Sequence, residues 1–383
     1  MKYGVPLLLL LICGGPLQAG PKAPPALPEL RLAAIFADSG EAASYDRASV
    51  AIVRHLTAQH NQSADRRFQL HLLEFDTQSS ALGARRAAKQ AVQANAHLVI
   101  GSNWSALSMA MAPVLQQARI PMLSPASTQN ELTRTGQYIF RLNYNNNVLG
   151  AAAATFARQY LKARTAVVLT NQSQIYSQQL TDVFVRQFRA SGGTVLLTAD
   201  YLRDTINFKP QLQQVSRMGA DVLFVPGYGQ DVGTIIRQLR ALPSLLPVLC
   251  ADGCMADMYR YAGKDLRYTF GLFYWHPDLP GMAQHPFRLW LRSQNIGHFN
   301  AAPLVYDAMQ LVLHAAGQLN EFSAEAMRLA LARLHNYPGI TGNVSFNRQR
   351  EPEKTVQALD LSDPAVHYLG PVVSQQQVQE LKP

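Results

Sequence analysis

One short stretch constrains the fold of this chain more than any other. Residues 96–133 read AHLVIGSNWSALSMAMAPVLQQARIPMLSPASTQNELT. The stretch holds two apolar segments, His97–Ile100 and Ile120–Leu123, which we expect to be strands, with a helix between them. Because the strands of a βαβ unit run parallel, the turns that follow them, residues 101–105 and 124–128, emerge at one edge of the sheet. That edge is where open α/β sheets bind ligands.

Both turns are rich in hydroxyl groups. Ser105 lies in the first turn, and Ser127 and Thr128 lie in the second. Hydroxyl groups together with free backbone N–H groups at helix N-termini suit a carboxylate or another anion. The alternative is that Ser105 and Ser127 only cap helices. Two such turns one βα unit apart favour the anion site.

The length of 383 residues is more than one compact core usually serves, so we expect two domains. Strand and helix patterns alternate from Leu30 to Leu142, and the alternation starts again with a helix at 151–160. The first helix is expected to be capped by Ser44. A strand pair is expected at 342–346 and 355–361, followed by a short strand at 366–369. The pattern predicts an α/β protein with two doubly wound lobes.

The formal net charge of +9 predicts a basic surface. The chain has no run of five or six Lys or Arg residues and no ladder of alternating basic and aromatic residues. We therefore expect a solvated basic surface and no nucleic-acid partner.

The N-terminus has the pattern of a signal peptide over residues 1–19. Lys2 supplies the charge, Pro6–Ile12 is the apolar core, and cleavage is expected after Ala19. A proline-rich linker follows at 20–29. The apolar core is too short to span a bilayer, so the pattern predicts export, to the periplasm. The alternative is an N-terminal lipid anchor on Cys13, because Leu-Leu-Ile-Cys resembles a lipobox.

Two cysteines remain after cleavage, Cys250 and Cys254, in the sequence Cys-Ala-Asp-Gly-Cys. In an oxidising compartment such a pair can form a disulfide that closes a small loop. Free thiols and a zinc half-site are the alternatives. No second Cys/His pair stands at finger spacing, so we expect no metal site.

Six segments, in this order, carry a family resemblance: IGSNWSALS, IPMLSPASTQNELT, YIFRLNYNNN, IYSQQLTDVFVRQFRASGGTV, ADVLFVPGYGQDVGTIIRQLR and GLFYWHPDLP. Together they resemble the leucine/isoleucine/valine-binding type of periplasmic solute receptor. The S-P-x-x-T-x-x-x-L-T signature is fairly specific, and the order of the other segments strengthens it. The resemblance runs from about Leu30 to Gly370.

The resemblance implies the type 1 periplasmic binding protein fold, in which two Rossmann-like lobes are joined by three crossover strands. In that fold the ligand is trapped when the lobes close. The crossovers are expected near 141–146, 272–276 and 339–342. The N-terminal lobe would comprise 30–142 and 276–341, the C-terminal lobe 143–275 and 342–372, and the tail 373–383.

The resemblance also implies ligand contacts from the first lobe. Ser105 matches the hydroxyl that binds the ligand carboxylate. Ala126 and Thr128 match the groups of the second turn that hold the α-amino and carboxylate groups, with Ser127 between them. Tyr45 stands where the family places an aromatic ring over the ligand.

From the second lobe, Tyr176 and Tyr228 match residues that close on the ligand, and Asp252 matches an acid that pairs with the ammonium group. An acid so placed would explain selection for a cation, because an unpaired buried ammonium group is costly. The alternatives are ordinary packing for Tyr45, Tyr176 and Tyr228, and a plain Asp-Gly turn for Asp252.

The chain departs from the family at three places. Trp104 is new and large, and could line the pocket, narrow it or pack in the core. Neutral Asn146 replaces an acidic hinge residue, and residues 346–351 replace the usual Asp-x-x-Gly turn. Gly227–Gly233 followed by Asp252 is nearly a Rossmann fingerprint for nucleotide binding, but its spacing is one residue too long.

We therefore expect an exported receptor of an ABC-type transporter that binds an amino acid or a related carboxylate or amide. A membrane permease would be its partner, the receptor would be a monomer, and no cofactor is expected. The alternative is an envelope sensor or scaffold of the same fold, with Trp104 filling the cleft. An enzyme has no support in the sequence, because no acid–base pair or nucleophile motif stands out.

Overall fold

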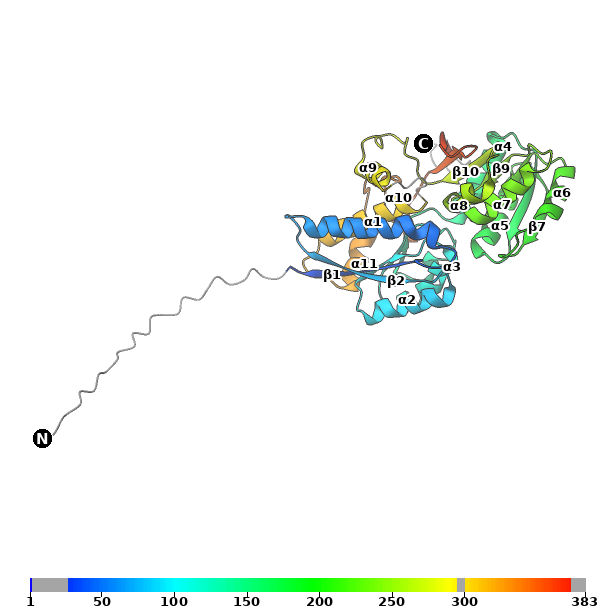
Figure 1. The fold of residues 1–383 in the computed structure, drawn as a ribbon. Coiled ribbons are helices and arrows are strands. Elements are labelled where there is room, and N and C mark those ends of the chain that lie inside the picture. Colours follow the sequence, from blue (N-terminus) through cyan, green and yellow to red (C-terminus); the bar gives the residue numbers. More distant parts are fainter. Residues whose placement is uncertain (2–26, 295–299, 373–383) are drawn as a thin grey trace.

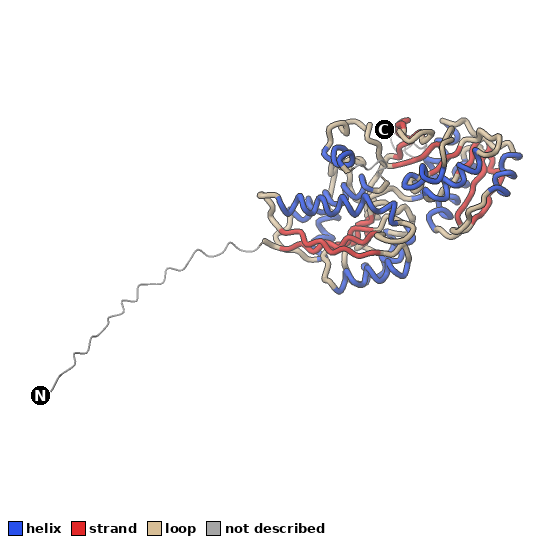
Figure 2. Tube along the Cα trace, viewed as in Figure 1, coloured by secondary structure: helices blue, strands red, loops and turns tan. Residues whose placement is uncertain are grey.

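The computed structural model describes residue 1 and residues 27–294 and 300–372. The predicted signal peptide beyond residue 1, Cys13, most of the predicted linker and the predicted tail at 373–383 lie outside the described residues. Two α/β lobes lie side by side, each with its own sheet (Figures 1 and 2). The predicted fold class is confirmed.

The first lobe is built on a five-stranded parallel sheet with the order β2-β1-β3-β4-β5. Its strands are β1 (Glu29–Phe36), β2 (Gln69–Asp76), β3 (Leu98–Gly101), β4 (Met122–Ser124) and β5 (Ile139–Arg141). The intervening helices are α1 (Ala43–Gln62), α2 (Ala81–Gln93), α3 (Ser105–Gln117) and the 3₁₀ turn η1 (Thr133–Thr135). The central strands β3 and β4 are buried throughout because helices cover both faces of the sheet, as Figure 1 shows for α1 and α2.

Three later helices also join the first lobe. They are α9 (Pro286–Ser293), α10 (Ala302–Gly317) and α11 (Ala324–Ala332). Helix α10 packs along α1, and α11 contacts both α10 and β3 (Figure 1). Among the described residues, no helix combines the length and apolar character that crossing a bilayer requires.

The second lobe has a seven-stranded sheet with the order β12-β11-β10-β9-β8-β6-β7. Its strands are β6 (Thr165–Asn171), β7 (Thr194–Tyr201), β8 (Val222–Phe224), β9 (Val248–Cys250), β10 (Thr269–Phe273), β11 (Val356–Asp360) and β12 (His367–Val372). Strands β6 to β10 are parallel, and β11 runs antiparallel to both of its neighbours. The helices are α4 (Asn146–Gln159), α5 (Ile175–Ala190), α6 (Lys209–Arg217), α7 (Gly229–Arg240) and α8 (Met255–Ala262).

Three local predictions are wrong. Residues 342–346 form no strand with β11, because β11 pairs with β10 and β12, and Val344 makes only an isolated bridge to Tyr337. Helix α4 begins at Asn146, five residues earlier than predicted, because the Asn145 side chain accepts from two backbone N–H groups of its first turn. Ser44 lies inside α1 and is not its cap, which is Ala42. Helix α8 was not predicted.

Candidate ligand-binding site

The two hydroxyl-rich turns lie against each other, and neither serine caps a helix. Helix α3 has Trp104 at its N-cap position, with no side-chain cap bond, and Ser105 is the first residue inside the helix. The Ser105 Oγ accepts a hydrogen bond of 3.3 Å from the backbone N–H of Thr128. No helix starts at Ser127, since the next helical turn, η1, is preceded by Leu132. The capping alternative is therefore wrong for both serines.

Ser127 ties the second turn to the first. Its hydroxyl donates to Ser108 Oγ at 2.6 Å and lies 3.3 and 3.2 Å from the carbonyl oxygens of Ser102 and Asn103. Ser108 in turn bonds to Ser124, which ends β4. The hydroxyl of Ser127 is thus satisfied within the protein and fixes the spacing of the two turns.

Thr128 is in a different situation. Its side chain is 1% exposed, and its Oγ1 is buried without a hydrogen-bond partner among the described residues. Leaving a buried hydroxyl unpaired costs about 1–3 kcal/mol. Buried polar atoms without partners are uncommon, and each calls for a partner such as a water, an ion or a ligand. The Thr128 hydroxyl is therefore available for a ligand, and Ser105 Oγ, which accepts from the Thr128 N–H, still has its own O–H to donate.

The backbone of the second turn is held from the crossover that follows β5. The four consecutive carbonyl groups of residues 126–129 all accept hydrogen bonds from residues 141–146. The bonds run from Asn143 Nδ2 to Ala126 O (3.2 Å), from Arg141 Nη1 to Ser127 O (3.4 Å) and Gln129 O (2.6 Å), and from the Asn146 N–H to Thr128 O (2.7 Å). This arrangement fixes the turn and connects it directly to the segment that joins the lobes.

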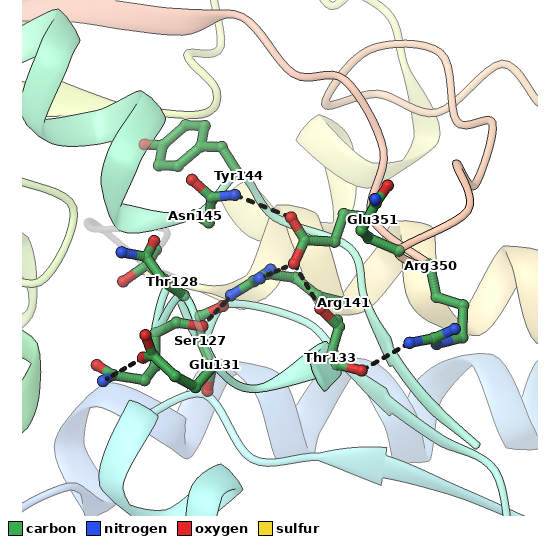
Figure 3. Close-up of polar contacts among 12 residues, drawn as sticks. Ser127, Thr128, Glu131, Thr133, Arg141, Tyr144, Asn145, Arg350 and Glu351 are labelled. Carbon is green, nitrogen blue, oxygen red and sulfur yellow. Dashed lines mark hydrogen bonds and ion pairs between the residues drawn. The ribbon is translucent and has the colours of Figure 1, made fainter. Parts of the chain in front are cut away.

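Arg141 is itself held by an acid that sequence reasoning missed. Its side chain is fully buried and pairs with Glu351, which also accepts from Thr133 Oγ1 at 2.6 Å and from Asn145 Nδ2 at 2.9 Å (Figure 3). Burial alone would raise the pKa of Glu351, but Arg141 and these hydrogen bonds hold it below its usual value. Glu351 thereby links the first lobe to Asn145, the cap of α4 in the second lobe. Its position within the atypical segment 346–351 was the only sequence signal.

Asp252 lies on the second lobe, buried at 4% exposure, in the loop between Cys250 and Cys254. Those two cysteines are bonded, as predicted. Tyr176 donates to Asp252 Oδ1 at 2.9 Å, and Asn143 Nδ2 donates to Oδ2 at 3.1 Å. Burial raises the pKa of Asp252 to about 7, and these two hydrogen bonds oppose that rise only in part. A buried acid that titrates near neutrality can accept a cation.

The predicted aromatic residues meet between the lobes. Trp104 from the first lobe lies flat on Tyr228 from the second, with ring centroids 3.9 Å apart and planes inclined by 7°. Tyr176 continues the stack at 5.3 Å from Tyr228. The Tyr45 hydroxyl reaches the Asp252 carbonyl at 3.4 Å. All four aromatic side chains are buried, and they come together with Asp252.

Further polar contacts hold the lobes together around this cluster. Ser44 of α1 donates to the Asp257 carboxylate on α8. Glu41 pairs with Arg203 at 3.5 Å. A cavity of about 20 Å³ remains beside Tyr45, Trp104 and Tyr228. The lobes are therefore closed on each other.

Helix packing accounts for the glycine spacing that resembles a nucleotide fingerprint. A Cβ atom at Gly229 would lie 2.6 Å from the backbone N of Asp257, and one at Gly233 would lie 2.4 Å from the carbonyl oxygen of Met258. Both contacts are with α8, so these glycines allow α7 and α8 to approach closely. Among the described residues, no group of three or more His, Cys, Asp or Glu side chains could hold a metal ion.

The family described as periplasmic binding protein matches residues 29–361. The chain belongs to this family. Among curated relatives of this periplasmic binding protein is an amino acid binding protein of Pseudomonas aeruginosa, 25% identical over 181 residues, which are 47% of this chain and 48% of the relative. The chain thus spans only about half the length of the curated relatives it matches.

Solved structures share the fold over nearly the whole chain. A leucine binding protein from Thermotoga maritima is 23% identical, with a TM-score of 0.83, over 91% of this chain and 99% of that one. A second similar structure is a branched-chain amino acid transporter substrate binding protein from Streptococcus pneumoniae in complex with isoleucine. It is 20% identical, also with a TM-score of 0.83, over 90% of this chain and 100% of that one. Both similarities concern the fold.

Proposed function

We propose that this periplasmic binding protein is an exported receptor of an ABC-type transporter, and that it traps a small polar solute between its lobes. The observation that carries the proposal is the position of Asn143. Its amide contacts both the Ala126 carbonyl of the first lobe and the Asp252 carboxylate of the second. One small molecule can therefore reach both polar groups.

The two ends of the site differ in chemistry. Ser105 offers a hydroxyl group at the start of α3, where the helix dipole favours an anion, and Thr128 of the second turn offers another beside it. Asp252 offers a carboxylate, and Tyr45, Tyr176 and Tyr228 enclose it. A molecule with a carboxylate or amide oxygen at one end and an ammonium or amide N–H at the other satisfies both. We propose an amino acid or a related carboxylate or amide.

The lobes would move as two bodies. We propose an N-terminal lobe of 30–142 and 276–341 and a C-terminal lobe of 143–275 and 342–372, which hinge at the crossovers. Export would rely on residues 1–19. The receptor would act as a monomer and deliver its ligand to a membrane permease. The relatives that bear amino-acid-binding names support this class of ligand.

A second candidate function has one observation in its favour. The stack of Trp104 on Tyr228 closes the lobes and leaves a cavity of only about 20 Å³ beside it. A protein whose cleft is filled by its own side chain can serve as an envelope sensor or scaffold that contacts another protein.

A thermal-shift screen separates the two functions. The panel contains glycine, L-alanine, larger amino acids, short carboxylic acids, acetamide and urea. A receptor is stabilised by at least one compound, because a ligand at 100 times its Kd adds about 2.7 kcal/mol to the free energy of unfolding. Chromatography of the compound after incubation tests for turnover, which we expect to be absent. If no compound stabilises the protein, the scaffold function is favoured.

A further inference from the structure

We propose that Trp104 is the residue that limits ligand size, because its indole fills the space that a larger ligand side chain would need. The ligand would then be no larger than a short-chain amino acid or a short amide. This inference rests on the proposed solute-binding function and names the size class of its ligand.

The position of Trp104 in the chain brings its ring into the site. It is the N-cap residue of α3 and immediately precedes Ser105, whose Oγ bonds the Thr128 backbone. Its backbone is extended, its side chain is 4% exposed, and its ring contacts the opposite lobe. The indole thus lies next to the anion-binding hydroxyl groups, on the side where the lobes meet.

The contact with Tyr228 leaves no gap. With centroids 3.9 Å apart and planes inclined by only 7°, the two rings are in van der Waals contact, so no third group fits between them. The wall behind Tyr228 is also closed. Tyr176 stacks on Tyr228 from another side, with ring centroids 5.3 Å apart, and the Gly253 backbone packs so closely that an added Cβ atom would lie 3.0 Å from Tyr228 Cδ1. Tyr228 therefore cannot retreat to make room without displacing its neighbours.

The space that remains beside the stack is small. The cavity there measures about 20 Å³, and a single water needs about 10–15 Å³ on the same measure. A branched aliphatic side chain needs several times more. The indole itself is held by packing alone, since its buried Nε1 has no hydrogen-bond partner among the described residues. Removing it should leave an apolar slot whose shape matches a flat ring.

The test uses indole as the probe for that slot. In Trp104→Gly, indole should raise the melting temperature in a dose-dependent way, while it should have no effect on the wild type. Replacing Tyr228 by Ala in the Trp104→Gly background should weaken the effect at least tenfold, because the stacking wall is lost. Trp104→Ala provides a second, less disruptive cavity in case the glycine variant does not fold.

The same variants report on ligand size. The wild type should bind L-alanine or acetamide at least tenfold more tightly than L-leucine, and Trp104→Gly should gain at least tenfold in affinity for L-leucine. If the wild type binds L-leucine as tightly as the small compounds, or if neither folded variant responds to indole, the proposal is wrong. A third result would separate the two proposals. If no solute binds the wild type but indole still stabilises the variants, the solute-binding function is wrong, while the conclusion that Trp104 fills the slot is supported.

Discussion

The phenol of Tyr176 donates a hydrogen bond of 2.9 Å to the carboxylate of Asp252, and both side chains are buried at the junction of the lobes. The hydrogen bond stabilises the charged form of the acid, but burial outweighs it and raises the pKa of Asp252 to about 7. The acid therefore changes its charge close to neutral pH.

This pKa predicts a specific effect of pH on stability. Between about pH 4 and pH 7, the folded chain keeps the Asp252 proton and the unfolded chain releases it. The free energy of unfolding therefore falls as pH rises through that window. Asp252→Asn cannot ionise, so it should be more stable than the wild type by about 2–4 kcal/mol at pH 8 and about equal to it at pH 4.

Urea unfolding at both pH values checks this prediction. Burial also raises the pKa of Asp46 to about 7 and that of Asp231 to about 6, so the wild type keeps a pH dependence of the same sign from those groups. The relevant quantity is therefore the difference in the free energy of unfolding between the wild type and Asp252→Asn. A difference that does not change between pH 4 and pH 8 would mean that Asp252 is ionised throughout.

Glu351→Gln should cost about 3–5 kcal/mol in the free energy of unfolding, because it leaves the fully buried charge of Arg141 without its partner. Glutamine keeps the shape of the side chain and an oxygen that can accept from Thr133. The loss of stability therefore measures the effect of removing the negative charge of Glu351. The measurement is urea unfolding of the full chain at pH 7.

A half-exposed carboxylate provides the control for Glu351. Glu325 pairs with Arg328, and the side chain of Glu325 is 49% exposed while that of Arg328 is 16% exposed. Glu325→Gln should cost less than about 1 kcal/mol, since water screens such pairs. Equal losses in Glu325→Gln and Glu351→Gln would contradict the structural role assigned to the buried pair.

Gly229→Ala should destabilise the second lobe by about 1–3 kcal/mol, because the new Cβ would lie 2.6 Å from the backbone N of Asp257 and 2.7 Å from the carbonyl oxygen of Cys254. The matched control is Gly317→Ala at the end of α10, where nothing lies within 4 Å of the added atom. That change should be neutral or stabilising by up to about 1 kcal/mol. Thermal unfolding of both variants decides whether close packing of α7 on α8 requires glycine.

Cys250 and Cys254 should resist alkylation under denaturing conditions until a reductant is added, which peptide mass spectrometry can show. The double variant Cys250→Ala/Cys254→Ala should lose about 2 kcal/mol of stability, because the unfolded chain is no longer closed into a loop. A reductant should destabilise the wild type and leave the double variant unchanged. Free thiols in the untreated wild type would disprove the disulfide.

The sequence predicted the parts of the fold that depend on local patterns. Strand segments such as Leu98–Gly101 are uniformly apolar because both faces of the sheet are covered, and the hydroxyl-rich turns follow directly from the ends of two such strands. The loop that carries Asp252 and the aromatic positions of the second lobe came from the family resemblance. The structure brings them together with Trp104.

Other features depend on contacts that no local pattern encodes. Arg141 and Glu351 are 210 residues apart, so their pairing could not be read from either segment. The start of α4 depends on whether the Asn145 side chain caps the helix or faces solvent. The run of asparagine residues in the sequence is compatible with either position. The sequence allowed the indole of Trp104 to line the pocket, to narrow it or to pack in the core. Its position is determined by the contact with Tyr228 of the other lobe.

Isothermal titration calorimetry can show whether the turn containing Thr128 holds a ligand. The titrant is the compound from the small-solute panel that stabilises the wild type most. We expect binding to one site in the wild type and a loss of about 1–3 kcal/mol of binding free energy in Thr128→Ala, because a buried hydroxyl would no longer pair with the ligand. Thr198→Ala, at an exposed position on β7, should bind like the wild type. Unchanged affinity in Thr128→Ala, or no heat of binding from any compound of the panel, would show that this turn does not hold the ligand.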